Sequence, residues 1–519
     1  MRVRFLDKLP AKLPVLAVCR SDEAGLLPAA RRVNQLLKGA LARAGQRRRA
    51  EEDEGPSVVE LTAPKAIKSR RVLLLDLGRR RRLDSERAEA AGAALAKAVA
   101  QAGESDAVLV LDHPEQAVLA APELAAHLAL GARLGAYRFD RYRTKARPED
   151  PIGRLETLWI VTPAAAAAQA AWRRLGPVAA GVELARDLSN EPSNVITPDG
   201  FIERTRQALG PLGVEIAVLD EKKLAKLGMN AMLAVGSGSE NRPRLLLMRW
   251  RGAPGRPFAF VGKGVTFDTG GISIKKAAGM EEMKADMSGA AAVVGLMRAL
   301  AGRRAKVPAI GVAALVENMP SGTAYRPGDV IKTFSGKTLE IVDTDAEGRV
   351  VLSDALAFTV QKFRPRAMVD LATLTYAVLA ALGQAFSGVF SNDDKLAERL
   401  VAAGQATGDR LWRLPLDAEY ERNLKSQIAD LRQCAPDDAF ADAAHGAQLL
   451  QNFVDGTPWA HLDIAGRMFG KRDDDGNWPG SPGFGVRLLD AFLASREADL
   501  ASDAKPAAPK RAEPASRKR

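Results

Sequence analysis

Acidic and basic side chains gather in two short stretches of this sequence, each beside an apolar run. The first stretch is residues 261–275 with its continuation at 283–287, and the second is residues 343–349. The charged residues in them are Lys263, Asp268, Lys275, Lys284, Asp286, Asp343, Asp345, Glu347 and Arg349. A charge beside a buried strand is costly unless it is paired or bound to metal. The two stretches therefore indicate a metal site or a buried cluster of ion pairs.

Two other chemistries do not fit the residue types at these positions. The step Gly262-Lys263-Gly264 superficially looks like a phosphate-binding loop, but that loop needs Ser or Thr directly after its lysine. A Ser-His-Asp or Cys-His arrangement is also unsupported, because the polar stretches hold no histidine. The four histidines are His113, His127, His445 and His461. We expect His461, which lies within an apolar run, to be a hydrogen-bonded core residue.

The motifs in these stretches are similar to those of the leucyl aminopeptidase family, the two-metal cytosol aminopeptidases. They are Lys-Gly-Val-Thr-Phe-Asp-Thr-Gly-Gly-Ile-Ser-Ile-Lys at 263–275, Met-Lys-Ala-Asp-Met at 283–287 and Thr-Asp-Ala-Glu-Gly-Arg at 344–349. Further matches lie at 187–192, 317–320, 326–329 and 459–466. The resemblance covers residues 185–495, whereas the N-terminal part matches only in size and α/β character.

The resemblance implies that two divalent metal ions bind to each subunit, with Mn, Zn or Mg as the candidates. The implied ligands are Lys263, Asp268, Asp286, Asp345 and Glu347. Asp268 would bridge both ions, Lys263 and Asp286 would bind one, Asp345 would bind the other, and Glu347 would bind both. Two nearby dications repel each other, so such a site needs several carboxylates. Lysine coordinates metal only as a neutral amine, which requires an adjacent dication to depress its pKa.

Two further residues have catalytic roles by the same resemblance. Lys275 would bind and polarise the scissile carbonyl and stabilise the developing oxyanion. Arg349 would hold a bicarbonate that acts as general base. A water or hydroxide that bridges the two metals would attack the peptide carbonyl, while the free α-amine of the peptide would occupy a metal coordination position. The implied activity is metal-dependent release of N-terminal amino acids from peptides.

Five residues are expected to contact the substrate, and two of them depart from the family pattern. The five are Met283, Asp343, Thr373, Leu374 and Tyr376. The family usually has Asn at the position of Asp343 and Gly at the position of Tyr376. We expect these two residues to narrow and acidify the cleft, which would shift preference from leucine toward small, polar or basic N-terminal residues. The alternative is that both changes are absorbed without effect on preference.

The polar stretches require a scaffold of alternating strands and helices. Apolar runs predict strands at 244–250, 258–261, 309–316 and 367–371, and helical periodicity predicts helices at 288–301 and 353–362. Central strands flanked by helices imply a sheet that is covered on both faces. We therefore predict an α/β catalytic metallopeptidase domain over residues 191–501.

The remainder of the chain divides into three parts. Residues 1–162 predict a small α/β domain, with strands at 72–77 and 107–111 and helices at 88–102 and 117–134. Residues 163–190 predict linking helices, two in succession, because Gly176-Pro177 interrupts the helical pattern. Residues 502–519 are rich in Ala, Pro, Lys and Arg without apolar periodicity, which predicts a disordered basic tail.

Composition narrows the class of protein. The chain has 519 residues with 47% hydrophobic and 27% charged content, which excludes a disordered or fibrous protein. Its two cysteines cannot build a disulfide framework or a Cys-rich zinc site, and this usage fits a reducing cytoplasm. We expect no signal peptide and no membrane-spanning segment. The predicted location is cytoplasmic, without a membrane partner.

The resemblance implies a homohexamer that acts on peptides with a free N-terminus, and two alternatives stay open. The formal net charge is +12, and basic residues concentrate at 47–49, at 79–82 and in the tail. A nucleic-acid-binding role is therefore the first alternative, and its affinity would fall steeply with salt. The second alternative is a catalytically silent member of the family, whose charges form only a buried ion-pair cluster.

Overall fold

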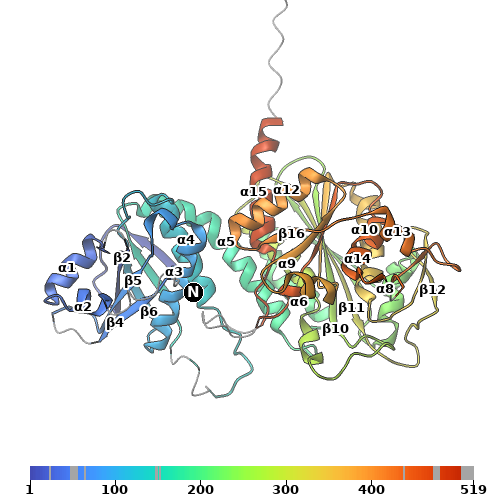
Figure 1. Cartoon of the computed structure of the whole chain (residues 1–519), viewed down its shortest axis with the longest axis horizontal. Helices are drawn as coiled ribbons and strands as arrows, with labels where there is room; N and C mark the ends of the chain where they lie inside the picture. Colours follow the sequence, from blue (N-terminus) through green and yellow to red (C-terminus); the bar gives the residue numbers. More distant parts are fainter. Residues whose placement is uncertain are drawn as a thin grey trace, which may run out of the picture.

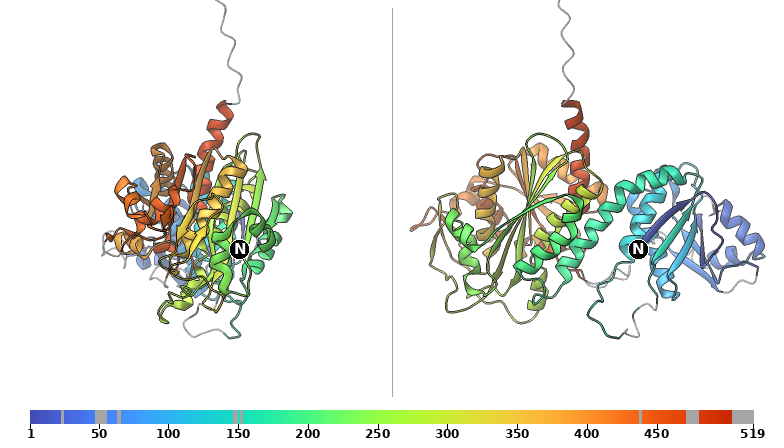
Figure 2. Two further views of the ribbon diagram at one scale, coloured as in Figure 1. Left: turned by 90° about the vertical axis from the view of Figure 1, so that its right-hand side faces the viewer. Right: turned by 180° about the vertical axis from the view of Figure 1, so that it is seen from behind.

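The computed structural model describes residues 1–22, 25–46, 56–62, 66–145, 150, 153–436, 439–470 and 480–503. An N-terminal lobe and a larger C-terminal lobe lie side by side, with helix α5 (Ala165–Asn190) between them (Figure 1). The view from behind in Figure 2 (right) shows the same separation of the lobes. Among the described residues, no helix is long and apolar enough to cross a membrane.

The N-terminal lobe is built on one mostly parallel sheet. The strands are β1 (Arg2–Leu6), β2 (Val15–Ser21), β3 (Gly25–Leu26), β4 (Val58–Thr62), β5 (Arg71–Asp76), β6 (Asp106–Val110) and β7 (Thr157–Val161). Their order is β1-β7-β6-β2-β5-β4, with β3 paired to β2. The helices are α1 (Pro28–Leu36), α2 (Ala40–Gln46), α3 (Ser85–Gln101) and α4 (Ala121–Gly135), with the 3-10 turn η1 (Arg80–Arg82). The predicted strands and helices of this lobe are confirmed to within a few residues.

The link between the lobes is one helix, so the prediction of two successive helices over 163–190 is wrong. Helix α5 continues through Pro177, although a proline in a helix removes one backbone hydrogen bond. The helix packs on α9 (Ser288–Gly302), and a Cβ built on Gly181 would lie 2.3 Å from the carbonyl oxygen of Gly295. This close helix–helix contact supports α5 after the proline, and Ala168 packs in the core of the N-terminal lobe before it.

The C-terminal lobe contains an eight-stranded mixed sheet. Its strands are β8 (Glu215–Leu219), β9 (Arg244–Arg251), β10 (Phe258–Asp268), β11 (Pro308–Asn318), β14 (Ala367–Ala372), β15 (Ser387–Ser391), β16 (Leu411–Arg413) and β18 (Trp459–Asp463). The order is β16-β15-β18-β14-β10-β11-β9-β8. The four central strands β18, β14, β10 and β11 are parallel. A smaller sheet contains β12 (Val330–Lys332), β13 (Thr338–Glu340) and β17 (Leu431–Arg432).

Helices cover both faces of this sheet, as predicted. Strand β10 shows why, because Phe258 and Phe260 enter one hydrophobic core while Ala259 and Val261 enter the other. The first core includes side chains of α5, α9, α6 (Pro198–Leu209), α12 (Asp394–Thr407) and α15 (Val486–Asp503). The second includes side chains of α7 (Glu221–Leu227), α8 (Asn230–Val235), α10 (Glu347–Phe363) and α14 (Asp442–Gln451). Two short helices, α11 (Tyr376–Leu382) and α13 (Ala418–Asn423), complete the lobe.

Several predicted boundaries in this lobe are wrong in a consistent way. The strand predicted at 258–261 extends to Asp268, and the helix predicted at 353–362 begins at Glu347. In both cases the missing part contains buried polar residues, which interrupt an apolar pattern without ending the element. Helix α15 includes residues 502 and 503, which the sequence assigns to the tail. The other tail residues, 504–519, and the basic residues 47–49 lie outside the described residues.

Candidate active site

The predicted site residues converge at the carboxyl ends of the central parallel strands. Asp268 is the last residue of β10, Asn318 is the last residue of β11, and Thr373 directly follows β14. Glu347 is the first residue of α10 and reaches the same edge. Parallel strands of an α/β sheet commonly place ligand-binding residues at this edge, because their carboxyl ends meet there.

Three buried carboxylates form the centre of the site. Oxygen atoms of Asp268, Asp286 and Glu347 lie within 4.8 Å of one another. Asp286 follows the 3-10 helix η4 (Met280–Ala285), which lies over β10. Each of the three side chains is almost fully buried. Such a spacing lets several carboxylate oxygens face a single cation.

Lys263 bridges two of these carboxylates from within strand β10. Its Nζ lies 2.9 Å from Asp286 Oδ2 and 2.7 Å from Glu347 Oε1, and it donates a hydrogen bond of 2.9 Å to the carbonyl oxygen of Thr373. A Cβ built on Gly348 would lie 2.8 Å from Lys263 Cε, so the start of α10 approaches this side chain closely. Burial lowers the pKa of Lys263, but the surrounding carboxylates raise it above its ordinary value.

Lys275 reaches the site from the loop that follows β10. Its Nζ lies 2.9 Å from Asp268 Oδ2 and 2.5 Å from Asp345 Oδ1. The chain turns at Gly270 and Gly271, where φ is +87° and +67°, and a Cβ on Gly271 would lie 2.8 Å from Asn318 Oδ1. Glycine is favoured at both positions because other residues rarely adopt positive φ. The turn carries Lys275 back over the carboxylates.

The carboxylates of the site repel one another electrostatically. Burial and then the charge of Asp268 raise the pKa of Glu347, against the lowering effect of Lys263. Burial also raises the pKa of Asp286 well above its ordinary value. The pKa of Asp345 is raised to about 7 by burial and by Asp268. In the folded protein these groups therefore favour additional positive charge beside them.

The donor atoms fit divalent metal ions. Four carboxylates face only two ammonium groups in this cluster, which leaves an excess of two negative charges if all are ionised. Three buried oxygens, Asp286 Oδ2, Asp345 Oδ1 and Glu347 Oε1, have only the ion pairs with Lys263 and Lys275 and no further hydrogen bond from a described residue. Buried polar atoms are almost always hydrogen-bonded, so exceptions of this kind call for a ligand such as an ion. The predicted metal ligands are thus together, and their chemistry suits hard cations.

Two residues outside the predicted ligand set, Asn318 and Thr373, hold carboxylates in place, and Tyr325 supports the neighbouring loop. Asn318 Nδ2 donates to Asp268 Oδ1 at 2.8 Å and to the carbonyl oxygen of Thr344 at 3.0 Å. Thr373 Oγ1 donates to Asp286 Oδ1 at 2.6 Å. Tyr325 Oη donates to the same Thr344 carbonyl at 2.9 Å. Asn318 lies in a matching motif at 317–320, but nothing in the motif indicates its partner.

The guanidinium of Arg349 already contacts a carboxylate of the chain. Its Nη2 donates to Asp442 Oδ1 at 2.8 Å, and the Arg349 side chain is buried. The sequence predicts a bicarbonate at this position, and in the structure one nitrogen of the guanidinium is paired with Asp442. The sequence contains no signal for Asp442, which is 93 residues away along the chain.

The predicted substrate residues lie around the same edge of the sheet, with different surroundings. Thr373 and Leu374 follow β14, and Tyr376 begins α11 with an exposed side chain. Met283 is half-buried in η4. Asp343 Oδ1 accepts a hydrogen bond from the backbone N–H of Asp345 at 2.9 Å, so its carboxylate shapes the loop that carries Asp345.

The prediction for His461 is confirmed. The residue is fully buried in β18, and its Nδ1 lies 2.6 Å from Asp370 Oδ1. The other oxygen of Asp370 accepts a hydrogen bond from the indole of Trp459 at 2.6 Å. His461 is therefore a core residue held by Asp370, which adjoins it in the sheet.

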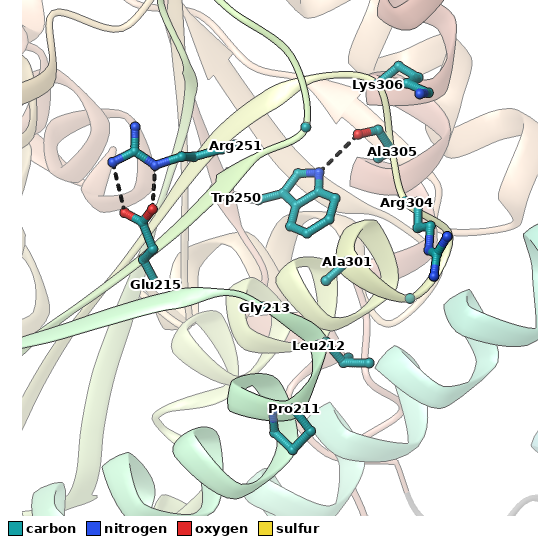
Figure 3. Close-up of a pocket in the computed structure, with 12 residues that line it drawn as sticks. Pro211, Leu212, Gly213, Glu215, Trp250, Arg251, Ala301, Arg304, Ala305 and Lys306 are labelled. Atoms are coloured by element: carbon teal, nitrogen blue, oxygen red, sulfur yellow. Dashed lines mark hydrogen bonds and ion pairs between the residues drawn. The ribbon is translucent and has the colours of Figure 1, made fainter.

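The cavity in Figure 3 lies at the opposite end of the sheet and contains none of the predicted site residues. Its volume is about 560 Å³. Arg251, which lines the cavity, lies opposite Pro308 in the sheet, and Pro308 is the first residue of β11. The site described above lies at the other end of that strand, at its last residue. Arg251 forms an ion pair with Glu215, and Trp250 donates a 3.0 Å hydrogen bond to the carbonyl oxygen of Ala305. These polar groups are already paired, so the cavity contributes nothing to the chemistry described above.

Sequence comparison places both lobes within one family. Residues 183–490 match the catalytic domain of the cytosol aminopeptidase family, and residues 15–146 match its N-terminal domain. A probable cytosol aminopeptidase of Xanthobacter autotrophicus is 47% identical over 464 residues, which cover 88% of this chain and 92% of that protein. One from Caulobacter vibrioides is 45% identical over 500 residues, covering 95% and 99%.

Solved structures give the same result. The bottromycin maturation enzyme BotP in complex with Mn superposes with a TM-score of 0.80 at 35% identity, covering 93% of this chain and 99% of that one. A mutant of tomato leucine aminopeptidase superposes with a TM-score of 0.82 at 30% identity, covering 95% and 96%. The fold and the arrangement of the two lobes are thus shared along nearly the whole chain.

Proposed function

Because this chain belongs to the cytosol aminopeptidase family and is a metal-dependent aminopeptidase, we propose that it releases N-terminal amino acids one at a time at the cluster of Asp268, Asp286 and Glu347. One observation carries this assignment. The carboxylates of the cluster are buried at the carboxyl edge of the sheet, and some of their oxygens have only an ion pair with lysine and no further hydrogen bond from a described residue. A catalytically silent protein would gain nothing from four carboxylates against two ammonium groups, since uncompensated buried charge destabilises the fold.

The proposed cofactor is a pair of divalent ions in each subunit. The proposed ligands are Lys263, Asp268, Asp286, Asp345 and Glu347. Oxygen-rich donors suit Mn or Mg as well as Zn, and the similarity to BotP, which was solved with Mn, favours Mn. When bound, the two ions supply positive charge that acidifies a water molecule and polarises the peptide carbonyl. Lys263 joins the ligands only as a neutral amine, so its proton must leave as metal binds.

Lys275 is the proposed electrophilic residue. Its side chain is 24% exposed, whereas that of Asp268 beside it is 3% exposed, so the ammonium can meet a substrate. Burial lowers its pKa, but Asp268 and Glu347 raise it above the ordinary value, so the group stays protonated. An ammonium beside the scissile carbonyl stabilises the negative charge that develops on the oxygen. The free α-amino group of a peptide would occupy a coordination position of a bound ion, which would account for exopeptidase action.

We also propose that substrate preference is shifted away from leucine. Tyr376 begins α11, three residues after Thr373, and its side chain is 79% exposed, so a bulky ring stands at this edge of the site. Asp343 already accepts a backbone hydrogen bond, which an asparagine oxygen could equally accept. We therefore assign most of the shift to Tyr376. Replacing Tyr376 with Gly should raise activity on leucine substrates relative to alanine substrates, and a wild-type enzyme that prefers leucine would contradict the proposal.

A panel of aminoacyl anilides tests the function directly. Activity should require Mn or Zn, disappear with chelator, and fall about 100-fold or more in Lys275→Ala, as when an oxyanion-stabilising group is removed. Lys276→Ala is the matched control, because Lys276 is the next residue and is exposed outside the cluster. If no anilide is cleaved with any metal by a folded protein, the catalytically silent alternative replaces the proposal.

Assembly, location and a nucleic-acid role are separate proposals. Similarity to the family supports a homohexamer in the cytosol, which light scattering of the purified protein and cell fractionation would test. Nucleic-acid binding is the weaker alternative. Of the basic segments, the structure describes residues 79–82, where Arg80 donates to the carbonyl oxygen of Glu115 at 3.3 Å. A gel shift at two salt concentrations tests this role, since phosphate contacts weaken strongly as salt rises.

A further inference from the structure

The anion-binding arginine of the site is already neutralised by the chain itself. Arg349 lies in the first turn of α10, two residues after the proposed metal ligand Glu347. Its Nη2 donates to Asp442 Oδ1 at 2.8 Å, with the Arg349 side chain 2% exposed and that of Asp442 49% exposed. A charge-assisted hydrogen bond of this length is a strong one. The guanidinium is thus buried, while the carboxylate paired with it is half-exposed.

The other contacts of Arg349 are weaker and come from neutral groups. Its Nη1 lies 3.4 Å from the carbonyl oxygen of Gln433 and 3.8 Å from Cys434 Sγ. Its Nε is buried and has no hydrogen-bond partner among the described residues. Asp442 is therefore the one carboxylate that forms an ion pair with Arg349 in the described part of the chain.

Helix α14 keeps Asp442 on the guanidinium. Asp442 is the first residue of this helix, and Gly446 lies one turn later on the same side. A Cβ built on Gly446 would lie 3.5 Å from Arg349 Cζ and Nη2, and 3.1 Å from Leu374 Cδ2. The helix backbone therefore rests against Arg349, and the same arginine adjoins Leu374 of the expected substrate cleft. A free anion cannot approach the guanidinium from the face that α14 covers.

The carboxylate of Asp442 has the charge and the O–C–O geometry of bicarbonate. We propose that Asp442 takes the place of a dissolved bicarbonate at Arg349, so that this enzyme carries its own anion and works without added bicarbonate. Because the Asp442 carboxylate is tethered to the chain, its effective concentration at Arg349 is about millimolar or more. A free bicarbonate ion must compete with it for the guanidinium. In this role Asp442 would accept the proton that bicarbonate would otherwise accept, and Arg349 would position it. The inference rests on the proposed function for its kinetic test, but not for its binding test.

The second carboxylate oxygen of Asp442, Oδ2, is the atom that could take part in the reaction. It accepts no hydrogen bond from a described residue, and the side chain is half-exposed, so this oxygen is available to water. Arg349 holds Oδ1 by a 2.8 Å hydrogen bond, which orients the carboxylate and leaves Oδ2 as a hydrogen-bond acceptor. A structural ion pair alone would not need the second oxygen to remain accessible.

The kinetic test compares wild type with Asp442→Ala in buffer purged of carbon dioxide and in a few millimolar bicarbonate. Metal is kept saturating, and chloride serves as the ionic-strength control. We expect wild-type kcat to change less than about twofold, whereas kcat of the variant falls about tenfold or more without bicarbonate and recovers severalfold with bicarbonate or formate, as a lost general base or its equivalent would. Asp442→Asn keeps the shape without the charge, so its kcat should fall as in Asp442→Ala but recover little with bicarbonate or formate, because the amide fills the place of the anion. Asp417 is an exposed carboxylate in the same lobe that caps a helix, and its replacement in Asp417→Ala should leave the enzyme like wild type.

A binding test needs no activity. Bicarbonate should raise the melting temperature of Asp442→Ala and leave that of wild type unchanged, because a ligand stabilises only the protein that binds it. The inference is overturned if wild-type kcat rises severalfold with bicarbonate, if a folded Asp442→Ala is as active as wild type in its absence, or if neither anion restores activity or stability to the variant. Absence of all peptidase activity in wild type instead overturns the proposed function, and the melting test still decides the role of Asp442.

Discussion

Replacing Thr373 with Val should weaken metal binding without removing any metal ligand. The Thr373 hydroxyl donates to Asp286 Oδ1 at 2.6 Å, and both residues are buried. Valine has nearly the same shape as threonine but no hydroxyl, so the substitution removes the hydrogen bond with little change in packing. Asp286 then loses the group that orients one of its oxygens.

The size of the effect follows from that single bond. A hydrogen bond to a charged group contributes roughly 1.5–3 kcal/mol, and each 1.4 kcal/mol corresponds to a factor of ten in affinity. Metal affinity should therefore fall about 10–100-fold, the range usual when a partner of a metal ligand is removed. The unfolding free energy of the metal-free protein should fall by about 1–3 kcal/mol, because a buried acceptor is left without its donor.

Calorimetric titration of Mn into chelator-treated protein measures the affinity, and anilide hydrolysis at saturating Mn measures kcat and KM. Thr375→Val is the matched control, since its hydroxyl donates to the buried Asp463 Oδ2 at 2.7 Å and Asp463 is outside the metal cluster. The control should lose stability and keep its metal affinity. The sequence assigns Thr373 to substrate binding, and that role would instead raise KM at saturating metal. Unchanged metal affinity in Thr373→Val would refute the positioning role.

Two further predictions concern packing and pH. Gly348→Ala should lower metal affinity and melting temperature, because its Cβ would come within 2.8 Å of Lys263 Cε and displace that side chain; equal affinity in a titration of Mn would contradict this. Asp354 is buried, its oxygens accept from the backbone N–H groups of Phe334 and Met232, and burial raises its pKa to about 7. Since the folded pKa exceeds the unfolded value, this contribution to stability is complete below about pH 4 and is lost as pH rises through 7. Relative to Asp354→Asn, wild type should lose about 2 kcal/mol of unfolding free energy between pH 5 and pH 8. Denaturant titrations at the two pH values measure this change, and an equal change in unfolding free energy for both proteins would refute the prediction.

The amino-acid sequence was sufficient for the class of fold and for the inventory of the site. Apolar runs predicted the central strands, and polar residues at 263–275 and 343–349 marked where the chemistry lies. The structure then brought Lys263, Asp268 and Glu347 to one edge, because the carboxyl ends of parallel strands meet there. Boundaries were wrong where buried polar residues interrupt the pattern, since hydrophobic periodicity reports burial only for apolar side chains.

Only the tertiary structure decided how the charged groups are paired. Asp442 and Arg349 are 93 residues apart, and Thr373 and Asp286 are 87 apart, so no local pattern links either pair. Helix α5 likewise continues through Pro177 because it packs against α9. Periodicity and capping act over a few residues, whereas an ion pair or a close helix contact depends on where the chain returns in space. For that reason the residues of the acidic cluster could be named from the sequence, but the carboxylate that pairs with Arg349 could not.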